Sequence, residues 1–400
     1  MIRIYFFQLL LLIFIINGCT NKSNQSVEFQ VPISTLDKDL FLSEYADSIY
    51  YVRLQSSEDY VISDDLSFKF SENYILARDR ITRSVYLYDK SGQFISKIGS
   101  KGAAPDEYVD LLSFDIDESA GKIFLGDHPR KSIISYDLKG AYIDRFALDH
   151  YFGDFIVTQQ GDLLIFTDQN EFNLVQQVPT IHVVDYQGKS IHKTYRSLPY
   201  PGNTNTFGTL YHYGDRIHII PQANYVDSAF YIDDNYQLQP YFELVYEGRI
   251  DKKSESFTDS LLFLPVNKGI GIYMPVIETK NLIFAMGSSE NRYRKDFVFD
   301  KKTGVCYNVF KGTGRSYFAG LINDLDGGVA FYPMGRINES WVYNLLTPDH
   351  IQHMDHKFHE SDTIIRDLDA HRSMKAYLAG VQEDDLMVLQ IVRFKDISNL

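Results

Sequence analysis

The sequence predicts an all-β fold, a six-bladed β-propeller of four-stranded antiparallel blades, with a short helix and strand at the C-terminus. Three observations support this prediction. The chain of 400 residues is rich in Tyr (29) and Phe (28), which favour strands. An alternating aromatic and aliphatic run, ending in an acidic residue and a polar turn, recurs along the chain. Its first four copies are evenly spaced, which a sandwich or single barrel would not require.

The recurring acidic residue marks the repeat. The first four copies are 48 residues apart, a fifth follows an insertion of 19 residues, and a sixth has Asn in place of Asp. These markers are Asp89, Asp137, Asp185, Asp233, Asp300 and Asn344. At the first position of a type I turn, an Asp side chain accepts hydrogen bonds from the following backbone amides, and a Gly three residues later takes a positive φ. We therefore expect hairpin residues, not catalytic carboxylates.

Two further strands precede each marker and complete the blades. The predicted pairs are 66–70 with 73–79, 111–117 with 122–127, 154–159 with 162–168, 209–214 with 216–221, 274–279 with 282–287, and 320–325 with 328–333. One repeat before the first outer strand lies the segment SIYYVRLQ, residues 48–55. We expect this N-terminal strand to complete the sixth blade and close the ring.

The C-terminal region departs from the repeat. Residues 361–379 predict a docked helix, with cap-type residues Ser361 and Asp362 at its start and Gly380 after its end. Residues 386–394 predict a final strand, to which the repeat assigns no partner. The insertion at 247–270 predicts a short helix or lid.

The N-terminus resembles a bacterial lipoprotein signal. Residues 1–18 combine Arg3 with an apolar run that is too short to span a membrane, and Cys19 follows directly. We expect Cys19 to carry the lipid that attaches the chain to the membrane, residues 19–34 to be a flexible tether, and residues 35–400 to be the propeller. By its resemblance to such signals, Thr20 indicates the outer membrane, on either its periplasmic or its cell-surface face.

Composition excludes two classes of protein. The chain has 39 Lys and Arg against 53 Asp and Glu, a net charge of -14, whereas a nucleic-acid-binding protein needs a basic surface. Two cysteines cannot form a disulfide scaffold. With Cys19 acylated, Cys306 is the remaining thiol, and its strand-like context predicts a small buried hydrophobic residue.

Residues 96–140 resemble an NHL-type repeat and, more closely, the six-bladed β-propeller lipoproteins of Bacteroides-like bacteria. The resemblance rests on Gly99, Gly102, Pro105 and the pair Glu107–Tyr108, followed by a strand, Asp127 and the YD..G hairpin. Residues 324–346 share it. The resemblance implies a fold and a lineage. It implies no activity, because these lipoproteins have no agreed one.

The sequence favours a non-catalytic binding or scaffold module over an enzyme. It contains no G-x-S-x-G, H-E-x-x-H or P-loop motif. The alternative is a metal-assisted hydrolase or lyase in the central channel, which Asp115, Asp117 and Asn323 could approach, although their spacing identifies no metal site. We predict no obligatory cofactor, and zinc or calcium is the ion that this alternative would use.

Four histidines recur at every third position, at His350, His353, His356 and His359. On a helix, two or three of them would share one side and could bind zinc. In a loop they would form a solvated connector between the last blade and the C-terminal helix. The spacing allows both interpretations.

Cations gather in predicted loops at one end of the propeller, mainly those joining the second and third strands. The residues are Arg80, Arg83, His128, Arg130, Lys131, Arg292, Arg294, Arg315 and Arg336. On a chain of net charge -14, such a ring would attract an acidic glycan or a carboxylate-rich protein partner. The alternative is that these cations pair with neighbouring carboxylates.

Overall fold

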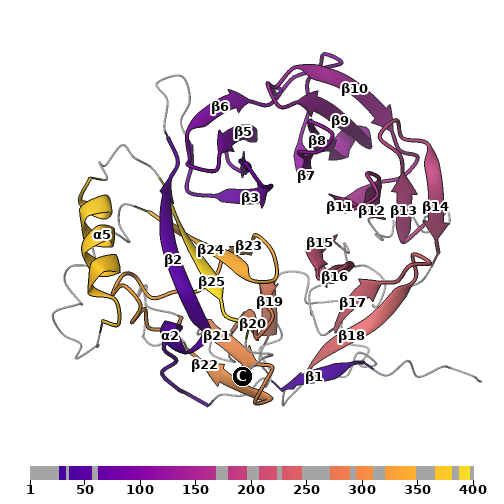
Figure 1. The fold of residues 1–400 in the computed structure, drawn as a ribbon. Helices are drawn as coiled ribbons and strands as arrows, with labels where there is room; N and C mark the ends of the chain where they lie inside the picture. The colour runs from indigo at the N-terminus through magenta and orange to yellow at the C-terminus, as the bar shows by residue number, and fades with distance from the viewer. Residues whose placement is uncertain are drawn as a thin grey trace, which may run out of the picture.

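The computed structural model describes residues 27–32, 36–55, 62–167, 179–195, 207–222, 228–245, 271–288, 294–309, 320–347, 365–380 and 387–396. These residues form six sheets that follow one another around a ring (Figure 1). The predicted six-bladed β-propeller is therefore confirmed.

Five blades are built from consecutive strands, each with its first strand nearest the ring axis. Blade one contains β3 (Leu66–Phe70), β4 (Tyr74–Asp79), β5 (Ser84–Asp89) and β6 (Phe94–Lys97). Blade two contains β7 (Leu111–Asp117), β8 (Lys122–Asp127), β9 (Ser132–Asp137) and β10 (Tyr142–Ala147), with the short helix η1 (His128–Arg130) between β8 and β9. Blade three contains β11 (Phe152–Val157), β12 (Leu163–Thr167), β13 (Ile181–Val184) and β14 (Ser190–Thr194). Blade four contains β15 (Phe207–Tyr213), β16 (Arg216–Gln222), β17 (Ser228–Ile232) and β18 (Leu238–Val245). Blade five contains β19 (Gly271–Glu278), β20 (Leu282–Ser288), β21 (Arg294–Asp300) and β22 (Val305–Asn308).

The marker aspartates of these five blades are hairpin residues, as predicted. Oδ1 of Asp89 accepts the backbone N–H groups of Ser91 and Gln93 at 2.8 and 3.0 Å. Gly92 has φ +87°, a conformation that costs a glycine little. In the fourth copy the corresponding residue is Tyr236, which adopts φ +58° without this advantage.

The sixth blade joins the two ends of the chain. Its strands are β23 (Gly335–Arg336), β24 (Trp341–Leu346), β25 (Val388–Phe394) and β2 (Ala46–Arg53). The N-terminal strand β2 is outermost and pairs antiparallel with β25 from Ala46↔Phe394 to Arg53↔Val388. The predicted closure is thus confirmed, and β2 and β24 are the partners of the C-terminal strand.

The inner part of the sixth blade differs from the prediction. Asn344 lies within the second strand, β24, where its side chain contacts Gln390 at 3.3 Å, so it is not a hairpin marker. The segments 320–325 and 328–333 are not the first two strands of this blade, and the isolated bridge Leu321↔Phe331 joins them instead. The short strand β23 takes the first position. The repeat pattern failed here because the third strand comes from the C-terminus.

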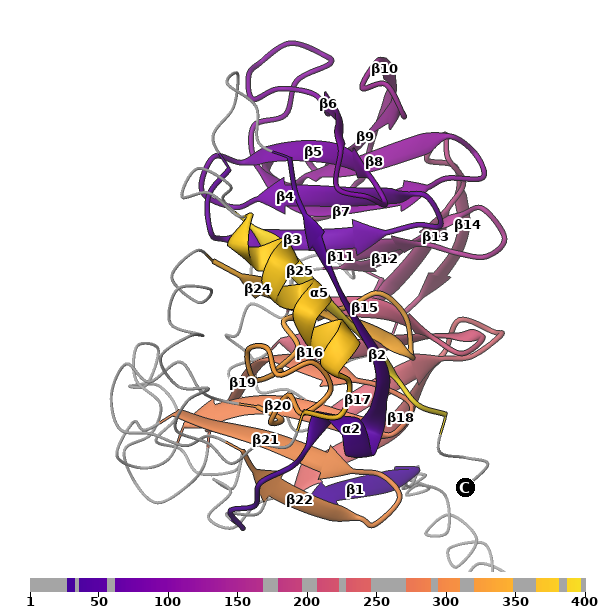
Figure 2. The same cartoon turned by 60° about the vertical axis from the view of Figure 1, so that its left-hand side comes forward.

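The two ends of the ring carry different connections, and the longest ones all lie at one end. At one end, which we call the hairpin face, first strands connect to second strands and third to fourth through two to five residues. At the other end, the long-connection face, second strands connect to third strands and each blade connects to the next. The longest connection there is residues 347–387, between β24 and β25. Figure 2 shows the helix α5 (Leu368–Ala379) of this connection crossing in front of the sixth blade.

Helix α5 begins later than predicted. Asp367 is its N-cap and accepts the backbone N–H groups of Asp369 and Ala370 at 3.0 and 2.8 Å. Residues 365–367 are not helical, and 361–364 lie outside the described part of the chain. The helix ends before Gly380, as predicted, and docks through buried Met374 and Leu378.

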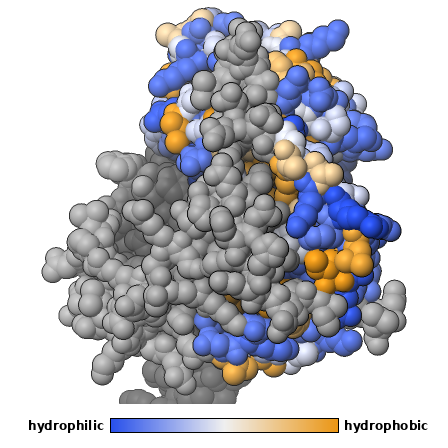
Figure 3. Space-filling model, turned by 90° about the vertical axis from the view of Figure 1, so that its left-hand side faces the viewer, coloured by the Kyte–Doolittle hydropathy of each residue, from blue (hydrophilic) through white to orange (hydrophobic). Residues whose placement is uncertain are grey.

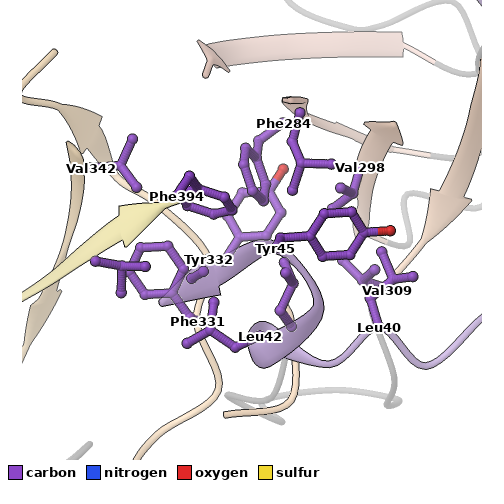
Figure 4. Packing of buried hydrophobic residues seen from close by; sticks show 14 of the residues in the cluster. Leu40, Leu42, Tyr45, Phe284, Val298, Val309, Phe331, Tyr332, Val342 and Phe394 are labelled. Carbon is purple, nitrogen blue, oxygen red and sulfur yellow. The ribbon is translucent and has the colours of Figure 1, made fainter. Parts of the chain in front are cut away.

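The segment before β2 and the end of β25 also pack into the core between blades five and six. The short helix α2 (Leu42–Tyr45) precedes β2, and Leu42 and Tyr45 contact a cluster that includes Phe284 and Phe394 (Figure 4). The hydroxyl of Tyr45 lies 3.3 Å from Oδ2 of Asp300 on blade five. The closing blade is therefore anchored by apolar packing as well as by strand pairing.

Part of the segment predicted as a tether, residues 19–34, belongs to the propeller instead. Strand β1 (Phe29–Pro32) adds a fifth strand to blade four by parallel pairing with β18. Val31 is buried, and the ring of Phe29 lies 5.3–6.3 Å from those of Tyr241, Phe242 and Phe299. The predicted short helix or lid at 247–270 lies outside the described residues, and β19 starts directly after it, at Gly271. Cys306 is buried, as predicted.

A series of N-terminal deletions tests how much β1 and β2 each contribute to the stability of the propeller. Removing residues 1–26 should leave the melting temperature unchanged. Removing residues 1–35 deletes β1 and should cost about 2–3 kcal/mol, the value of one well-buried apolar side chain. Removing residues 1–56 takes away β2 and should abolish cooperative unfolding, because the sixth blade loses its closing strand. Calorimetry measures all three, and an unchanged transition in the longest deletion would contradict closure by β2.

Candidate functional site

A cavity of about 880 Å³ lies at the centre of the ring. Residues from all six blades line it, including Phe68, Asp115, Ile156, Thr209, Val276 and Gly335. Its wall is mixed, with aromatic and aliphatic side chains beside a few charged groups. This composition is typical of ligand-binding cavities, in which apolar surface supplies affinity and a few polar groups set orientation.

Two aspartates of the inner strands are used to join neighbouring blades. Oδ2 of Asp115 on β7 accepts the backbone N–H of Val157 on β11 at 2.8 Å. Oδ2 of Asp154 on β11 accepts the N–H of Leu210 on β15 at 2.9 Å. These carboxylates satisfy N–H groups on strand edges that face the ring axis and pair with no strand there. They are structural acceptors, so Asp115 is not a free metal ligand.

His212 and Lys69 also line this part of the channel. Nε2 of His212 lies 2.9 Å from the carbonyl oxygen of Val157, so both backbone groups of Val157 are held by side chains of adjacent blades. Burial raises the pKa of Asp154 to about 6, and the positive charge of Lys69 opposes that rise. Among the described residues, no hydrogen bond or ion pair engages the ammonium group of Lys69, although this side chain lines the cavity.

A second cation that lines the cavity, Arg336, contacts residues of blades four and five. Its guanidinium group stacks over the ring of Tyr211 at 3.4 Å from the centroid and donates to the carbonyl oxygen of Glu278 at 3.0 Å. The buried carboxylate of Glu278 accepts hydrogen bonds from Tyr211 and Tyr241 at 2.9 and 2.7 Å and pairs with Lys301. This network fixes Arg336 at the cavity wall.

The predicted ring of cations is only partly assembled. Arg80 and Arg83 lie on the long-connection face, as expected. Arg80 forms an ion pair with Asp65 there, and Arg83 forms one with Asp110 at 2.9 Å. Arg336 does not lie with them. It belongs to the first strand of the sixth blade, next to the β23–β24 hairpin, rather than to a second-to-third-strand loop.

The remaining predicted cations are engaged locally or lie outside the description. Arg130 donates to the carbonyl oxygen of Glu107 at 2.9 Å and lies 3.7 Å from Asp127. Lys131 lies over the ring of Tyr151 at 4.4 Å, and the ring of His128 is 5.1 Å from the same tyrosine. Arg292 and Arg315 lie outside the described residues, and of Arg294 only the backbone is described. Local pairing thus accounts for most of the described cations.

The other predicted metal ligands are also held by neighbours. Asp117 accepts hydrogen bonds from Ser119 at 2.6 Å and from Tyr186. Burial alone would raise the pKa of Asp117, but these hydrogen bonds outweigh burial and the pKa is lowered. Nδ2 of Asn323 donates to Asp326 at 2.7 Å. His350, His353, His356 and His359 lie outside the described residues. Among the described residues, three side chains of metal-binding type lie close together elsewhere, at Asp149, His150 and His182.

Sequence reasoning missed Lys69, Asp154 and His212. They come from three different blades, and nothing in their local sequence distinguishes them from other strand residues. They could have been identified only by combining the alternation of side chains along each inner strand with the arrangement of the six inner strands around the channel.

The described outer surface on the side of α5 and β2 is mostly hydrophilic, with small, separate apolar patches (Figure 3). Scattered apolar patches of this kind are ordinary on protein surfaces. Within the described part of the chain, no helix is both long and apolar enough to cross a membrane.

Comparison with known proteins places the chain in a family. Residues 27–393 match the model of a family described as a domain of unknown function, DUF4934. Since this match covers well over half of the chain, the protein belongs to that family. None of the curated proteins compared with the chain matches it.

A solved structure from Bacteroides shares the fold. A putative exported protein of Bacteroides fragilis is 18% identical, with a TM-score of 0.64 over 92% of this chain and 99% of that one. A member of the DUF4221 family from Bacteroides vulgatus is 10% identical, with a TM-score of 0.44 over 88% and 97% of the two chains. The first similarity agrees with the predicted Bacteroides propeller resemblance at the level of the fold. The NHL-type repeat and the lipid anchor stay predictions.

A buried histidine beside the Glu278 network makes stability depend on pH. His218 on β16 is 2% exposed, and four tyrosine rings lie 4.4–6.0 Å from its own. Burial lowers its pKa to about 4, against the attraction of the Glu278 carboxylate. Between pH 6.5 and 4 the unfolded chain therefore binds a proton that the folded chain does not, so stability falls as pH falls.

Two substitutions with opposite signs test this dependence. His218→Phe should remove on the order of 3 kcal/mol of the loss in unfolding free energy between pH 7 and 4. Asp154→Asn should make that loss larger, because the raised pKa of Asp154 lets the folded chain bind an additional proton as pH falls from about 6. Urea unfolding at a series of pH values measures both. Parallel curves for wild type and His218→Phe would contradict the assignment.

Proposed function

We propose that this protein is an exported, lipid-anchored binding module that takes a ligand with an anionic group, of the acidic glycan class, into its central channel. The observation that carries the proposal is the mixed cavity of about 880 Å³. Of the aspartates that line it, Asp115 accepts the backbone N–H of Val157 and Asp117 accepts the hydroxyl groups of Ser119 and Tyr186, whereas no described residue forms a hydrogen bond or ion pair with the ammonium of Lys69. A channel of this kind suits binding better than metal-assisted hydrolysis, which needs carboxylates free to hold an ion.

The charged groups support an anionic ligand. Lys69 and Arg336 come from different blades and both line the cavity, so they can hold one anionic group or two groups of an extended chain. A carboxylate or sulfate would form charge-assisted hydrogen bonds with them. Arg80 also lines the cavity, although its pairing with Asp65 weakens its attraction for a ligand.

The apolar lining supports a sugar-like or similarly amphipathic ligand. Phe70, Tyr211, Tyr332 and Tyr343 line the cavity together with aliphatic residues of blades one, three and five. Aromatic side chains offer flat apolar surface on which the less polar face of a sugar ring can pack. The proposed ligand thus combines ring surfaces with at least one negative charge.

The lipid anchor rests on sequence and on the similarity to a putative exported protein of Bacteroides fragilis. Cys19 follows a signal-like apolar segment, and the first described strand, β1, starts at Phe29, so a short tether separates the proposed lipid from the propeller. We place the protein at the outer membrane, on its periplasmic or cell-surface face.

A charge substitution in the channel tests the ligand class. Lys69→Ala should weaken binding of an acidic oligosaccharide by roughly 10–100-fold, the value of one charge-assisted hydrogen bond. Lys97→Ala, an exposed lysine at the end of β6, should leave affinity unchanged. Calorimetric titration with a panel of uronic-acid, sulfated and neutral oligosaccharides measures the effect. Equal affinity for neutral and acidic forms, or unchanged binding by Lys69→Ala, would contradict the proposal.

A second test concerns the anchor. Cys19→Ala should prevent acylation and move the protein from the membrane fraction to the soluble fraction of a Bacteroides host. Metabolic labelling with a fatty-acid analogue should mark the wild type and not the variant, while Cys306→Ala keeps the label. Labelling that persists in Cys19→Ala would contradict the assignment of the lipidated residue.

A further inference from the structure

Three metal-ligand side chains converge where blade two connects to blade three. Asp149 and His150 lie in the connection between β10 and β11, and His182 lies on β13. Nε2 of His150 is 2.9 Å from Nδ1 of His182 and 3.4 Å from Oδ1 of Asp149. The three ligand atoms all lie within 4.8 Å of one another. No other group of three such residues converges in the described part of the chain.

The outward-facing nitrogen of each histidine has a partner of its own. Nδ1 of His150 lies 3.2 Å from the carbonyl oxygen of Tyr151, which accepts its proton and leaves Nε2 as a lone pair. Nε2 of His182 lies 3.0 Å from Oγ of Ser190, which can accept a proton and leave Nδ1 as a lone pair. Metal-binding histidines are typically oriented in this way by an acceptor on the second nitrogen.

We propose that Asp149, His150 and His182 form a binding site for a divalent transition metal of the zinc class. The site offers two imidazole nitrogens and one carboxylate oxygen, with a fourth position for water, which is a common zinc ligand set. Tetrahedral coordination at about 2.0–2.1 Å places two nitrogens about 3.3 Å apart, so the histidine rings need to separate by only a few tenths of an ångström.

Burial and access at the site fit metal binding. His150 and His182 are 2% and 4% exposed, whereas the side chain of Asp149 is 71% exposed, so the ion has a route from solvent. Burial lowers the pKa of both histidines, that of His182 to about 4, which keeps the imidazoles neutral as metal binding requires. Lys193 pairs with Oδ2 of Asp149 at 3.3 Å and leaves Oδ1 directed at His150.

A metal-free arrangement of the same atoms is the competing explanation. In it, Ser190 donates to His182, His182 donates to His150, and His150 donates to the carbonyl of Tyr151. In this series of hydrogen bonds every donor also has an acceptor, but the carboxylate of Asp149 takes no part in it. Asp149 therefore distinguishes the two arrangements, because only a metal requires its carboxylate. A bound ion would tie the connection before β11 to β13, fixing the inner strand that lines the channel.

The experiment measures metal content and Co²⁺ spectra of the purified full chain, after chelation and dialysis against Zn²⁺ or Co²⁺. All variants carry His350, His353, His356 and His359 changed to Ala and no polyhistidine tag, so the count reports this site alone. The parent should hold one equivalent of metal. Asp149→Ala, at an exposed position, should remain folded and weaken metal affinity at least tenfold, and Ser190→Ala should weaken it roughly tenfold.

The matched control is His192→Ala, on the neighbouring strand β14, where Nε2 contacts Thr194 at 3.1 Å. This variant should keep full metal content. Conservative His182→Gln should lose the metal and retain a cooperative melting transition. A parent that binds no Zn²⁺ or Co²⁺, or an Asp149→Ala variant that binds metal as tightly as the parent, overturns the proposal. Because these readouts involve no channel ligand, their outcome is independent of the proposed function.

Discussion

The pairing of β2 with β25 is the constraint on which the rest of the structure depends. Each propeller blade buries its faces only against its neighbours, so an open ring would expose the faces of two blades at once. Here the first and last strands of the propeller repeat pair from Ala46↔Phe394 to Arg53↔Val388. Residues before β2 and at the end of β25 also share one apolar cluster with blade five (Figure 4). The central cavity exists only because this pairing holds six inner strands around one axis.

Closure of the ring leaves backbone groups of the inner strands without a strand partner, and side chains of neighbouring blades bind them. Six inner strands present an edge to the channel, and backbone groups on those edges need partners. Asp115, Asp154 and His212 supply them between blades two, three and four, and Arg336 does so between blades six and five. An acidic residue in a propeller channel is therefore not by itself a catalytic residue, since its oxygens can be fully occupied by backbone.

The sequence predicted the architecture well because one local cause repeats. An Asp that caps a hairpin recurs every 48 residues in the first four copies, and in the first three a Gly with positive φ follows three residues later. Predictions failed where position depended on the ring instead. Asn344 and Arg336 were displaced because the third strand of blade six comes from the C-terminus, and β1 was missed because a four-residue strand beside β18 has no periodic signal. Asp149, His150 and His182 were likewise missed, because the last is far from the others in sequence.

The charged groups of the channel link the proposed binding of an anion to proton uptake. Burial raises the pKa of Asp154 to about 6, and the positive charge of Lys69 keeps it from rising further. An anionic group paired with Lys69 cancels that charge, so the Asp154 carboxyl becomes easier to protonate once the ligand is bound. Because linkage is reciprocal, protonation of Asp154 strengthens the binding of the anion by the same factor. The geometry that joins blades three and four would thus also adjust ligand affinity near pH 6.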